Sequence, residues 1–281
     1  MFKRSFRSND RVEKSQAVKL KKSYYRDPAK LSKLQRSFEA PPQHPRSPPT
    51  ASDVGSLTSP IVTFTIGKEG RLFAAHEDVL VQSPFFEAAC RSQLLAQSKR
   101  IDLPDEEPEI FSCVLEYLYK GDYYPRLLHS KRRNSWELED AAVNSPNPQN
   151  PSGGRGSVEA TIYISAVGEY LLKDTVIYCA AEKYGLEELK RLALRKQGLQ
   201  SGIEVATILR SARYAYDHTP DSDSRLRAHY LALIIRCRKT FKRSGTMQLE
   251  MESGGKLFFD LFVALCNHVD DIVEMGYVHH Q

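Results

Sequence analysis

The chain has 281 residues, of which 41% are hydrophobic and 27% are charged, so it can bury a sizeable core and remain soluble. The net charge of +5 is uneven, because residues 1–60 hold 13 Lys/Arg against five Asp/Glu and the remainder carries a net charge of −3. The cysteines stand singly in apolar surroundings, which argues against a disulfide framework or a zinc site and predicts reduced core thiols. They are Cys90, Cys113, Cys179, Cys237 and Cys266.

The apolar pattern argues against secretion and membrane insertion. Residues 1–5 lack the apolar stretch of a secretory signal. The longest apolar run, 257–266, is interrupted by Asp260 and is too short to cross a bilayer. We therefore expect the protein in the cytoplasm, the nucleus or both.

Residues 1–58 are rich in Lys, Arg, Ser and Pro and contain few apolar side chains that could offset chain entropy. This composition predicts a disordered basic tail. The cluster at 19–22 has the character of a nuclear-import signal or a polyanion contact, but a solvated tail is the better interpretation. Nucleic-acid binding by such a run would be sensitive to salt and independent of sequence.

The clearest pattern begins at Ser59 and ends at Gly121. Val62, Phe64 and Ile66 alternate with polar residues, which predicts a half-buried strand, and the turn at 67–70 leads into a second strand. This stretch is expected to form a hairpin over 62–74, two small helices of which the second starts at Ser83, a strand over 99–103 and an amphipathic helix from Pro108.

Five short motifs follow one another within this stretch. They are Phe73-Ala74-Ala75-His76, Val79-Leu80, Ser83-Pro84-Phe85-Phe86, Ile101-Asp102-Leu103, and the run from Phe111 through Leu115 and Tyr119 to Gly121. In order and spacing they resemble the BTB (POZ) domain, particularly its filamentous-fungal representatives. The later run 176–189 is similar to the closing helical pair of that domain. The residues that form this structural signature are Phe73, His76, Leu80, Ser83, Phe86, Leu103, Phe111, Leu115, Tyr119 and Gly121.

The resemblance implies an α+β protein with the BTB/POZ fold, a small sheet flanked by a cluster of helices, followed by an all-helical C-terminal extension. We expect a disordered tail over 1–58, the BTB/POZ domain over 59–197 and the extension over 198–275. The polar stretch at about 126–157 shows no periodicity and predicts a flexible surface insertion.

Helical patterns dominate the chain after Leu171, although Thr161–Ile164 is β-prone. Apolar stripes strong enough to require packing partners predict helices that cover the BTB-like core and one another. The sequence contains no internal repeat or heptad run. The expected helices cover 171–184, 186–193, 203–216, 224–243 and 256–271.

No residue pattern points to catalysis or to a bound cofactor. The acidic residues 105–107 suit the start of a helix, and Asp270 and Asp271 suit a solvated helix end. His76 is expected to be a hydrogen-bonded structural residue, because no serine or cysteine stands in a nucleophile context beside it. His279 and His280 would bind metal only adventitiously. We therefore expect neither an enzyme nor a cofactor.

Proteins that resemble this chain bind other proteins: they dimerise, attach substrates to cullin-based ubiquitin ligases or recruit corepressors. The resemblance thus implies an interaction module, with a homodimer or a cullin among the expected partners and no membrane or small-molecule substrate. Residues 94–96 lack the acidic residue of the cullin-binding motif, and Ser59-Pro60 stands where a groove aspartate is usual. The candidate partner-binding residues are Leu94, Leu95, Tyr123 and Tyr124.

The alternative is a nucleic-acid-associated transcriptional regulator that uses the basic tail. The basic run 236–243 also raises this possibility. However, cations at a helix end complement the helix dipole, and no zinc-finger spacing or helix-turn-helix is present. The interaction module is the preferred hypothesis.

Overall fold

The computed structural model describes residues 11–12, 59–95, 100–131, 134–139, 160–200 and 202–278. Apart from residues 11–12, the predicted basic tail lies outside the described residues. The same holds for residues 132–133 and 140–157 of the predicted insertion and for His279 and His280.

A three-stranded sheet forms from the alternating pattern near the start of the described chain. Strand β2 (Ile61–Ile66) pairs antiparallel with β3 (Arg71–His76) and parallel with β4 (Arg100–Leu103). Val62, Phe64 and Ile66 are buried and their neighbours are more exposed, as period 2 requires. The predicted hairpin and third strand are both present.

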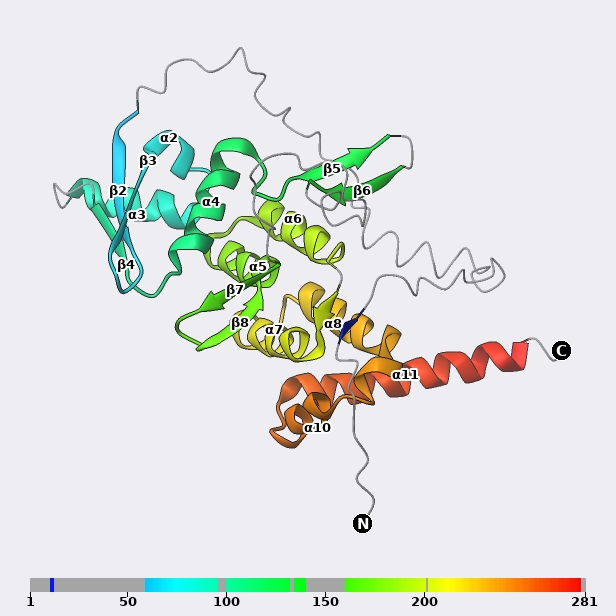
Figure 1. Ribbon diagram of the computed structural model, residues 1–281. Helices are drawn as coiled ribbons and strands as arrows, with labels where there is room; N and C mark the ends of the chain where they lie inside the picture. The colour runs from blue at the N-terminus through cyan, green and yellow to red at the C-terminus, as the bar shows by residue number, and fades with distance from the viewer. Residues whose placement is uncertain are drawn as a thin grey trace, which may run out of the picture.

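Helices α2 (Glu77–Leu80), α3 (Pro84–Leu95) and α4 (Pro108–Lys120) pack beside this sheet (Figure 1). The ring centroid of Phe64 lies 5.7 Å from that of Phe86 and 5.1 Å from that of Phe111, so one aromatic cluster joins β2, α3 and α4. Helix α4 ends at Gly121, whose φ of 72° is the left-handed conformation of a helix cap.

Helices α5 (Lys173–Tyr184) and α6 (Glu187–Gln197) form the predicted closing pair. Gly185 separates them at a φ of 69°, and a Cβ there would lie 3.2 Å from the ring of Pro84. The Ser83 hydroxyl donates a hydrogen bond to the Tyr184 carbonyl at 2.7 Å, across 101 residues of sequence. The closing pair is therefore joined directly to the first helix cluster.

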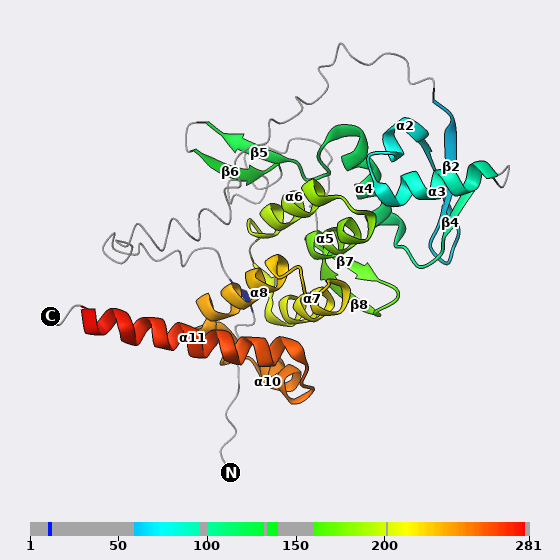
Figure 2. The same ribbon diagram turned by 180° about the vertical axis from the view of Figure 1, so that it is seen from behind.

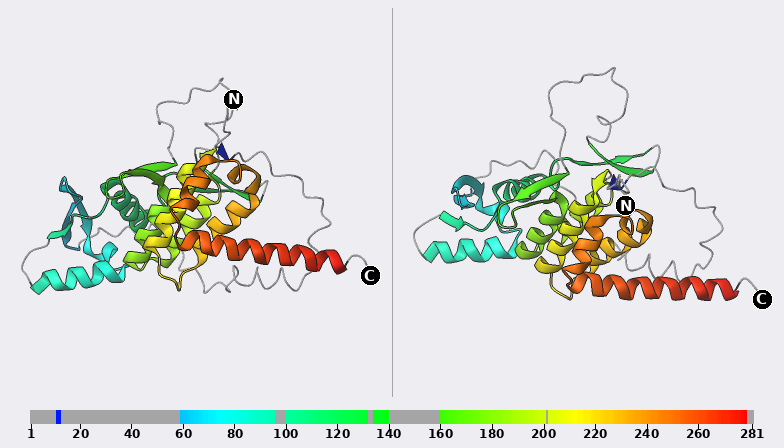
Figure 3. Two further views of the ribbon diagram at one scale, coloured as in Figure 1. Left: turned by 90° about the horizontal axis from the view of Figure 1, so that it is seen from below. Right: turned by 60° about the horizontal axis from the view of Figure 1, so that its bottom comes forward.

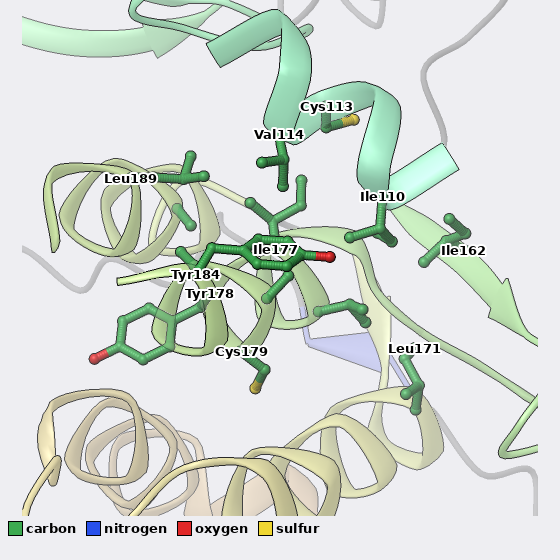
Figure 4. Packing of buried hydrophobic residues seen from close by; sticks show 14 of the residues in the cluster. Ile110, Cys113, Val114, Ile162, Leu171, Ile177, Tyr178, Cys179, Tyr184 and Leu189 are labelled. Atoms are coloured by element: carbon green, nitrogen blue, oxygen red, sulfur yellow. The ribbon is translucent and has the colours of Figure 1, made fainter. Parts of the chain in front are cut away.

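Helix α5 lies in the middle of the molecule. Most of its residues are buried, and Figure 4 shows Ile177 and Tyr184 facing Ile110 and Val114 of α4. Helix α7 (Val205–His218) covers the opposite side of α5 (Figures 1 and 2). A helix that is apolar all round needs such enclosure. The sheet region and the C-terminal helices therefore share one core.

The C-terminal region is helical, with three differences from the prediction. The expected helix over 224–243 is interrupted at Cys237, whose φ of −97° and ψ of 21° are not helical, so α8 and α9 are separate. Helix α10 was not predicted, and the last helix continues past residue 271. The remaining helices are α8 (Arg225–Arg236), α9 (Arg238–Phe241), α10 (Gly245–Glu252) and α11 (Lys256–Val278).

Part of the predicted insertion is an ordered hairpin, which corrects the expectation of an irregular loop throughout. Strands β5 (Leu127–Ser130) and β6 (Ser135–Leu138) pair antiparallel. The ring of Trp136 packs 4.7 Å from that of His129 and lies under the Arg195 guanidinium at 5.1 Å. The residues of β5, Leu127-Leu128-His129-Ser130, do not alternate between apolar and polar, so no strand period is visible in the sequence there.

A second hairpin precedes α5. Strand β7 (Thr161–Ile164) pairs with β8 (Glu169–Leu172), so the β-prone stretch is a strand as expected. The expectation that Leu171 begins a helix was wrong, because Leu171 pairs with Ile162 and is buried as part of β8. A short bridge pairs β1 (Arg11–Val12) with β9 (Ile203–Glu204).

The exposed fractions of certain cysteines and of two apolar residues of α11 differ from what was expected. Cys90, Cys113 and Cys179 are buried thiols, but Cys237 is half-buried and Cys266 is exposed, so not all cysteines belong to the core. Phe262 and Val269 were expected to pack on the core and are instead 64% and 54% exposed. Among the described residues, no helix is both long enough and apolar enough to span a bilayer.

The hydrogen bond between Ser83 and Tyr184 provides a test of this arrangement. Replacement Ser83→Ala leaves a buried carbonyl without its partner, so we expect the free energy of unfolding to fall by about 1–3 kcal/mol. Urea unfolding followed by circular dichroism measures this. The control Ser92→Ala removes an exposed hydroxyl that bonds within its own helix, and should change stability by less than about 0.5 kcal/mol. Equal effects of the two variants would contradict the assigned role of Ser83.

Candidate functional site

Of the predicted partner-binding residues Leu94, Leu95, Tyr123 and Tyr124, the structure describes the side chains of the two tyrosines. Tyr123 is fully buried and Tyr124 is half-buried. Leu94 and Leu95 lie in the last turn of α3, and their side chains are outside what the structure describes. Tyr123 was predicted to be exposed because it follows the end of α4, where a solvated loop is the usual expectation.

A buried polar cluster explains the position of Tyr123. We name it the Lys196 cluster, formed by Asp122, Tyr123, Asp174 and Lys196. The Tyr123 hydroxyl donates to an Asp174 carboxylate oxygen at 2.7 Å. The Lys196 ammonium group lies 2.5 Å from Asp122 Oδ1 and 3.5 Å from the centroid of the Tyr123 ring. The cluster joins the end of α4 to α5 and α6.

The Lys196 cluster has the residue types of an acid–base site, but its polar groups already bond to one another. The ammonium group has three N–H donors, and the Asp122 carboxylate and the carbonyls of Tyr123 and Pro125 accept all three. Burial raises the pKa of Tyr123 and of Asp174, and burial lowers the pKa of Lys196 against the opposing effect of Asp122. With its donors used internally, the cluster holds segments together and leaves no free group for a substrate.

A second buried lysine connects α6 to the segment before α8. The side chain of Lys190 is 2% exposed and pairs with Asp223 at 2.6 Å and with Glu182 and Glu187. Burial opposes its charge, but these carboxylates outweigh the effect and raise the pKa of Lys190. The Tyr178 hydroxyl also donates to Asp223 at 2.7 Å. Sequence analysis missed both lysines, because Lys196 pairs with Asp122 across 74 residues and Lys190 is enclosed only when Asp223 joins its nearby partners Glu182 and Glu187.

Three exposed apolar side chains of the sheet region lie where β2, α2 and α4 come together, whereas Leu72, which is 65% exposed, stands apart on β3 opposite Thr65. Ile61, Val81 and Tyr119 are 57%, 45% and 40% exposed, and we name this set the corner surface. The Glu77 amide donates to the Pro60 carbonyl at 3.0 Å, and the Gln82 side-chain amide donates to the Leu118 carbonyl at 3.2 Å. Pro60, Gln82 and Leu118 are the chain neighbours of Ile61, Val81 and Tyr119, so these bonds hold the backbone beside each apolar residue.

His76 and Tyr119 fix the same corner. The Tyr119 hydroxyl accepts a hydrogen bond from the His76 backbone N–H at 2.9 Å and lies 2.8 Å from His76 Nδ1. The Tyr119 hydroxyl is therefore held by His76, while 40% of the Tyr119 residue remains exposed. A surface with fixed side chains loses little conformational entropy when it binds a partner.

The other signature residues belong to the interior or to element ends. Leu80, Ser83, Phe86, Phe111 and Leu115 are buried. Phe73 and Leu103 are partly buried against the same core. Phe73 packs edge-on against Phe111 at 5.3 Å. Gly121 ends α4. These residues therefore have structural positions, and the exposed corner contains few of the sequence candidates.

Two further features could attract ligands. A cavity of about 300 Å³ is lined by side chains that include Gln197, Ile203, His229 and Arg236. Burial and the nearby charge of Arg236 lower the pKa of His229, so its imidazole is neutral over a wider pH range. The cations of the basic run 236–243 are all exposed, and Arg238 contacts the Ile235 carbonyl at 3.4 Å at the end of α8. That contact fits the predicted role of cations at a helix end.

Comparison with known proteins places the matched segment on the sheet and the helices packed beside it. The profile of the BTB/POZ domain matches residues 61–131. The "BTB/POZ and MATH domain-containing protein 5" of Arabidopsis thaliana is 32% identical over 83 residues, which are 28% of this chain and 20% of that protein. The chain thus spans about a fifth of the length of this relative. The protein contains a BTB/POZ domain, and such domains are protein–protein interaction modules rather than enzymes as a rule.

The Lys196 cluster predicts a large difference between buried and exposed lysines. Replacement Lys196→Met removes the cation that is paired with Asp122 and leaves two buried carbonyls without their donor, so we expect a loss of about 3–5 kcal/mol of unfolding free energy. The control Lys120→Met removes a lysine whose side chain is 56% exposed and paired with Glu116, and should cost less than about 1 kcal/mol. Chemical denaturation measures both. A loss below about 1 kcal/mol for Lys196→Met would contradict the assigned role of the cluster.

Proposed function

We propose that the protein is a non-enzymatic adaptor whose BTB/POZ domain, over residues 59–197, binds a protein partner through the corner surface. The helical extension over 198–275 would hold a second protein near the first. The observation that carries this proposal is the exposure of three apolar side chains on elements that hydrogen bonds hold in place. Exposed apolar groups that are held rigidly favour a protein partner, because association removes them from water without ordering a loop.

The buried titratable groups support binding rather than chemistry. The polar groups of the Lys196 cluster bond to one another inside the fold, and the carboxylates around Lys190 pair with that lysine. A general acid or base must instead reach a substrate in a cleft. The polar clusters thus stabilise the body that presents the corner surface.

A cullin and a second copy of the chain are the two partners to test. Both follow from the BTB/POZ resemblance, and a purified cullin is the more direct probe of an adaptor. The missing acidic residue at 94–96 means that recognition would depend on apolar contact at the corner. We place the protein in the cytoplasm or nucleus, where such partners occur.

Val81 and Val167 make a matched pair for this test, since both are 45% exposed and lie on different parts of the molecule. Replacement Val81→Glu would place a charge in the proposed contact, so we expect cullin capture in biolayer interferometry to weaken at least tenfold, or about 1.4 kcal/mol. Val167→Glu, in the turn between β7 and β8, should change affinity by less than about twofold.

A wild-type chain that binds neither a cullin nor itself would contradict the adaptor proposal. Mobility shifts of a labelled oligonucleotide, with the full chain and with a chain lacking residues 1–58, would then test the nucleic-acid alternative. If that alternative holds, the full chain shifts the oligonucleotide and the truncated chain does not.

A further inference from the structure

The last helix carries an apolar stripe on its solvent side. Phe259, Phe262, Val269 and Val273 are 67%, 64%, 54% and 48% exposed, and Cys266 between them is also exposed. We name these five residues the α11 stripe. The residues that attach α11 to the body, Leu257 and Leu261, are each 3% exposed. The stripe therefore does not belong to the face by which α11 is anchored.

The stripe has the spacing of a coiled-coil seam. Successive members are three, four, three and four residues apart, which is the a and d pattern of a heptad. Phe258, Leu261 and Leu265 fall between these positions, so the apolar residues of α11 taken together show no heptad. The heptad becomes visible only when the exposed apolar residues are considered apart from the buried ones. Figure 3 shows the C-terminal part of α11 extending past the other helices, where a second helix has access to it.

We propose that α11 pairs antiparallel with α11 of a second copy of this chain. In an antiparallel pair, a positions of one helix face d positions of the other. Phe259 then packs against Val269 of the second copy, and Phe262 packs against Cys266 of the second copy. Because the arrangement is twofold symmetric, each contact occurs twice and the interface closes with two chains.

The flanking residues fit this orientation. With Phe259 at position a, Val263 is at position e and Leu265 is at position g. In an antiparallel pair the two e positions lie beside each other, and so do the two g positions. Val263 therefore lies beside Val263 of the second copy, and Leu265 beside Leu265 of the second copy. The same register places Lys256 against Asp270 of the second copy. Lys256 already contacts Asp221 at 2.5 Å, yet its side chain is 52% exposed and can serve both carboxylates. A parallel pair would instead set the acidic ends, at Asp270 and Asp271, beside each other.

The apolar area is sufficient for a specific interface. Aromatic side chains bury about 150–250 Å² each, so two phenylalanines per copy, each about two-thirds exposed, contribute on the order of 500 Å² to the pair. The remaining stripe and flanking residues bring the total near the ~1,000 Å² expected of a specific contact. This interface goes beyond the proposed adaptor function, because it uses none of the corner surface.

Light scattering of the full chain tests the pairing. Phe262→Glu and Val269→Glu each place a charge in the seam, and because both side chains are exposed in the folded chain, neither should disturb folding. We expect each variant to have half the molar mass of the wild type at micromolar concentration. The control Tyr170→Glu, at a residue 53% exposed on β8, should keep the wild-type mass. An unchanged mass for both seam variants, or an equal loss in the control, would overturn the proposal.

Disulfide trapping tests the orientation. Phe259→Cys and Val269→Cys are each combined with Cys266→Ser, and the two proteins are oxidised separately and as a mixture. Antiparallel pairing predicts a crosslinked dimer in the mixture and little in either protein alone. Crosslinking of each protein with itself would overturn the antiparallel arrangement. Cullin capture by Phe262→Glu should equal that of the wild type, so failure here is distinguishable from failure of the adaptor proposal.

Discussion

The enclosure of α5 is the constraint on which the rest of the structure depends. Its two sides are covered by different parts of the chain: α4 and the aromatic cluster on one, α7 on the other. Neither part can leave without exposing a largely apolar helix to water, at roughly 25 cal/mol for each Å² of apolar surface. The BTB/POZ sheet region and the helical extension should therefore unfold as one unit. The Ser83–Tyr184 hydrogen bond and the Lys196 cluster fix how the packed helices are placed relative to one another. Each joins groups that are far apart in sequence at a defined distance.

Burial of charge inside this body has a physical purpose that differs from catalysis. A lysine that is removed from water requires acceptors for every N–H, and both Lys190 and Lys196 have them. Three of their carboxylate partners, Asp122, Glu182 and Asp223, come from outside α6, so the correct packing of α6 is the arrangement that satisfies both lysines. Buried ion pairs of this kind mainly select one packing arrangement. They add little to stability, since an apolar pair of the same shape would often be as stable. A rigid body of this kind presents exposed apolar residues in fixed positions.

The sequence predicted those elements whose signals are local. Alternation at Val62, Phe64 and Ile66 predicted β2, and the residues at Ser83, Pro84 and Gly185 marked the ends of α3 and α5 correctly. Tyr123 was predicted to be at the surface, because nothing near it in the chain indicates that Asp174 and Lys196 enclose it. The β5–β6 hairpin was missed because Leu127–Ser130 does not alternate between apolar and polar residues, and the packing of the hairpin depends on Arg195 of α6. The α11 stripe was hidden for the opposite reason: apolar residues surround most of that helix, and only the fold shows which of them remain exposed.

The surfaces left by this core lie on different elements: the corner surface on the BTB/POZ region and the stripe on α11. Their use in one molecule depends on the unity of the core that α5 provides. Native-state hydrogen exchange in increasing urea measures that unity most directly, through the opening free energies of amides in β2, α4, α5 and α7. The account predicts one common value, equal to the global unfolding free energy. Two separate values, with β2 and α4 protected after α7 has opened, would contradict it.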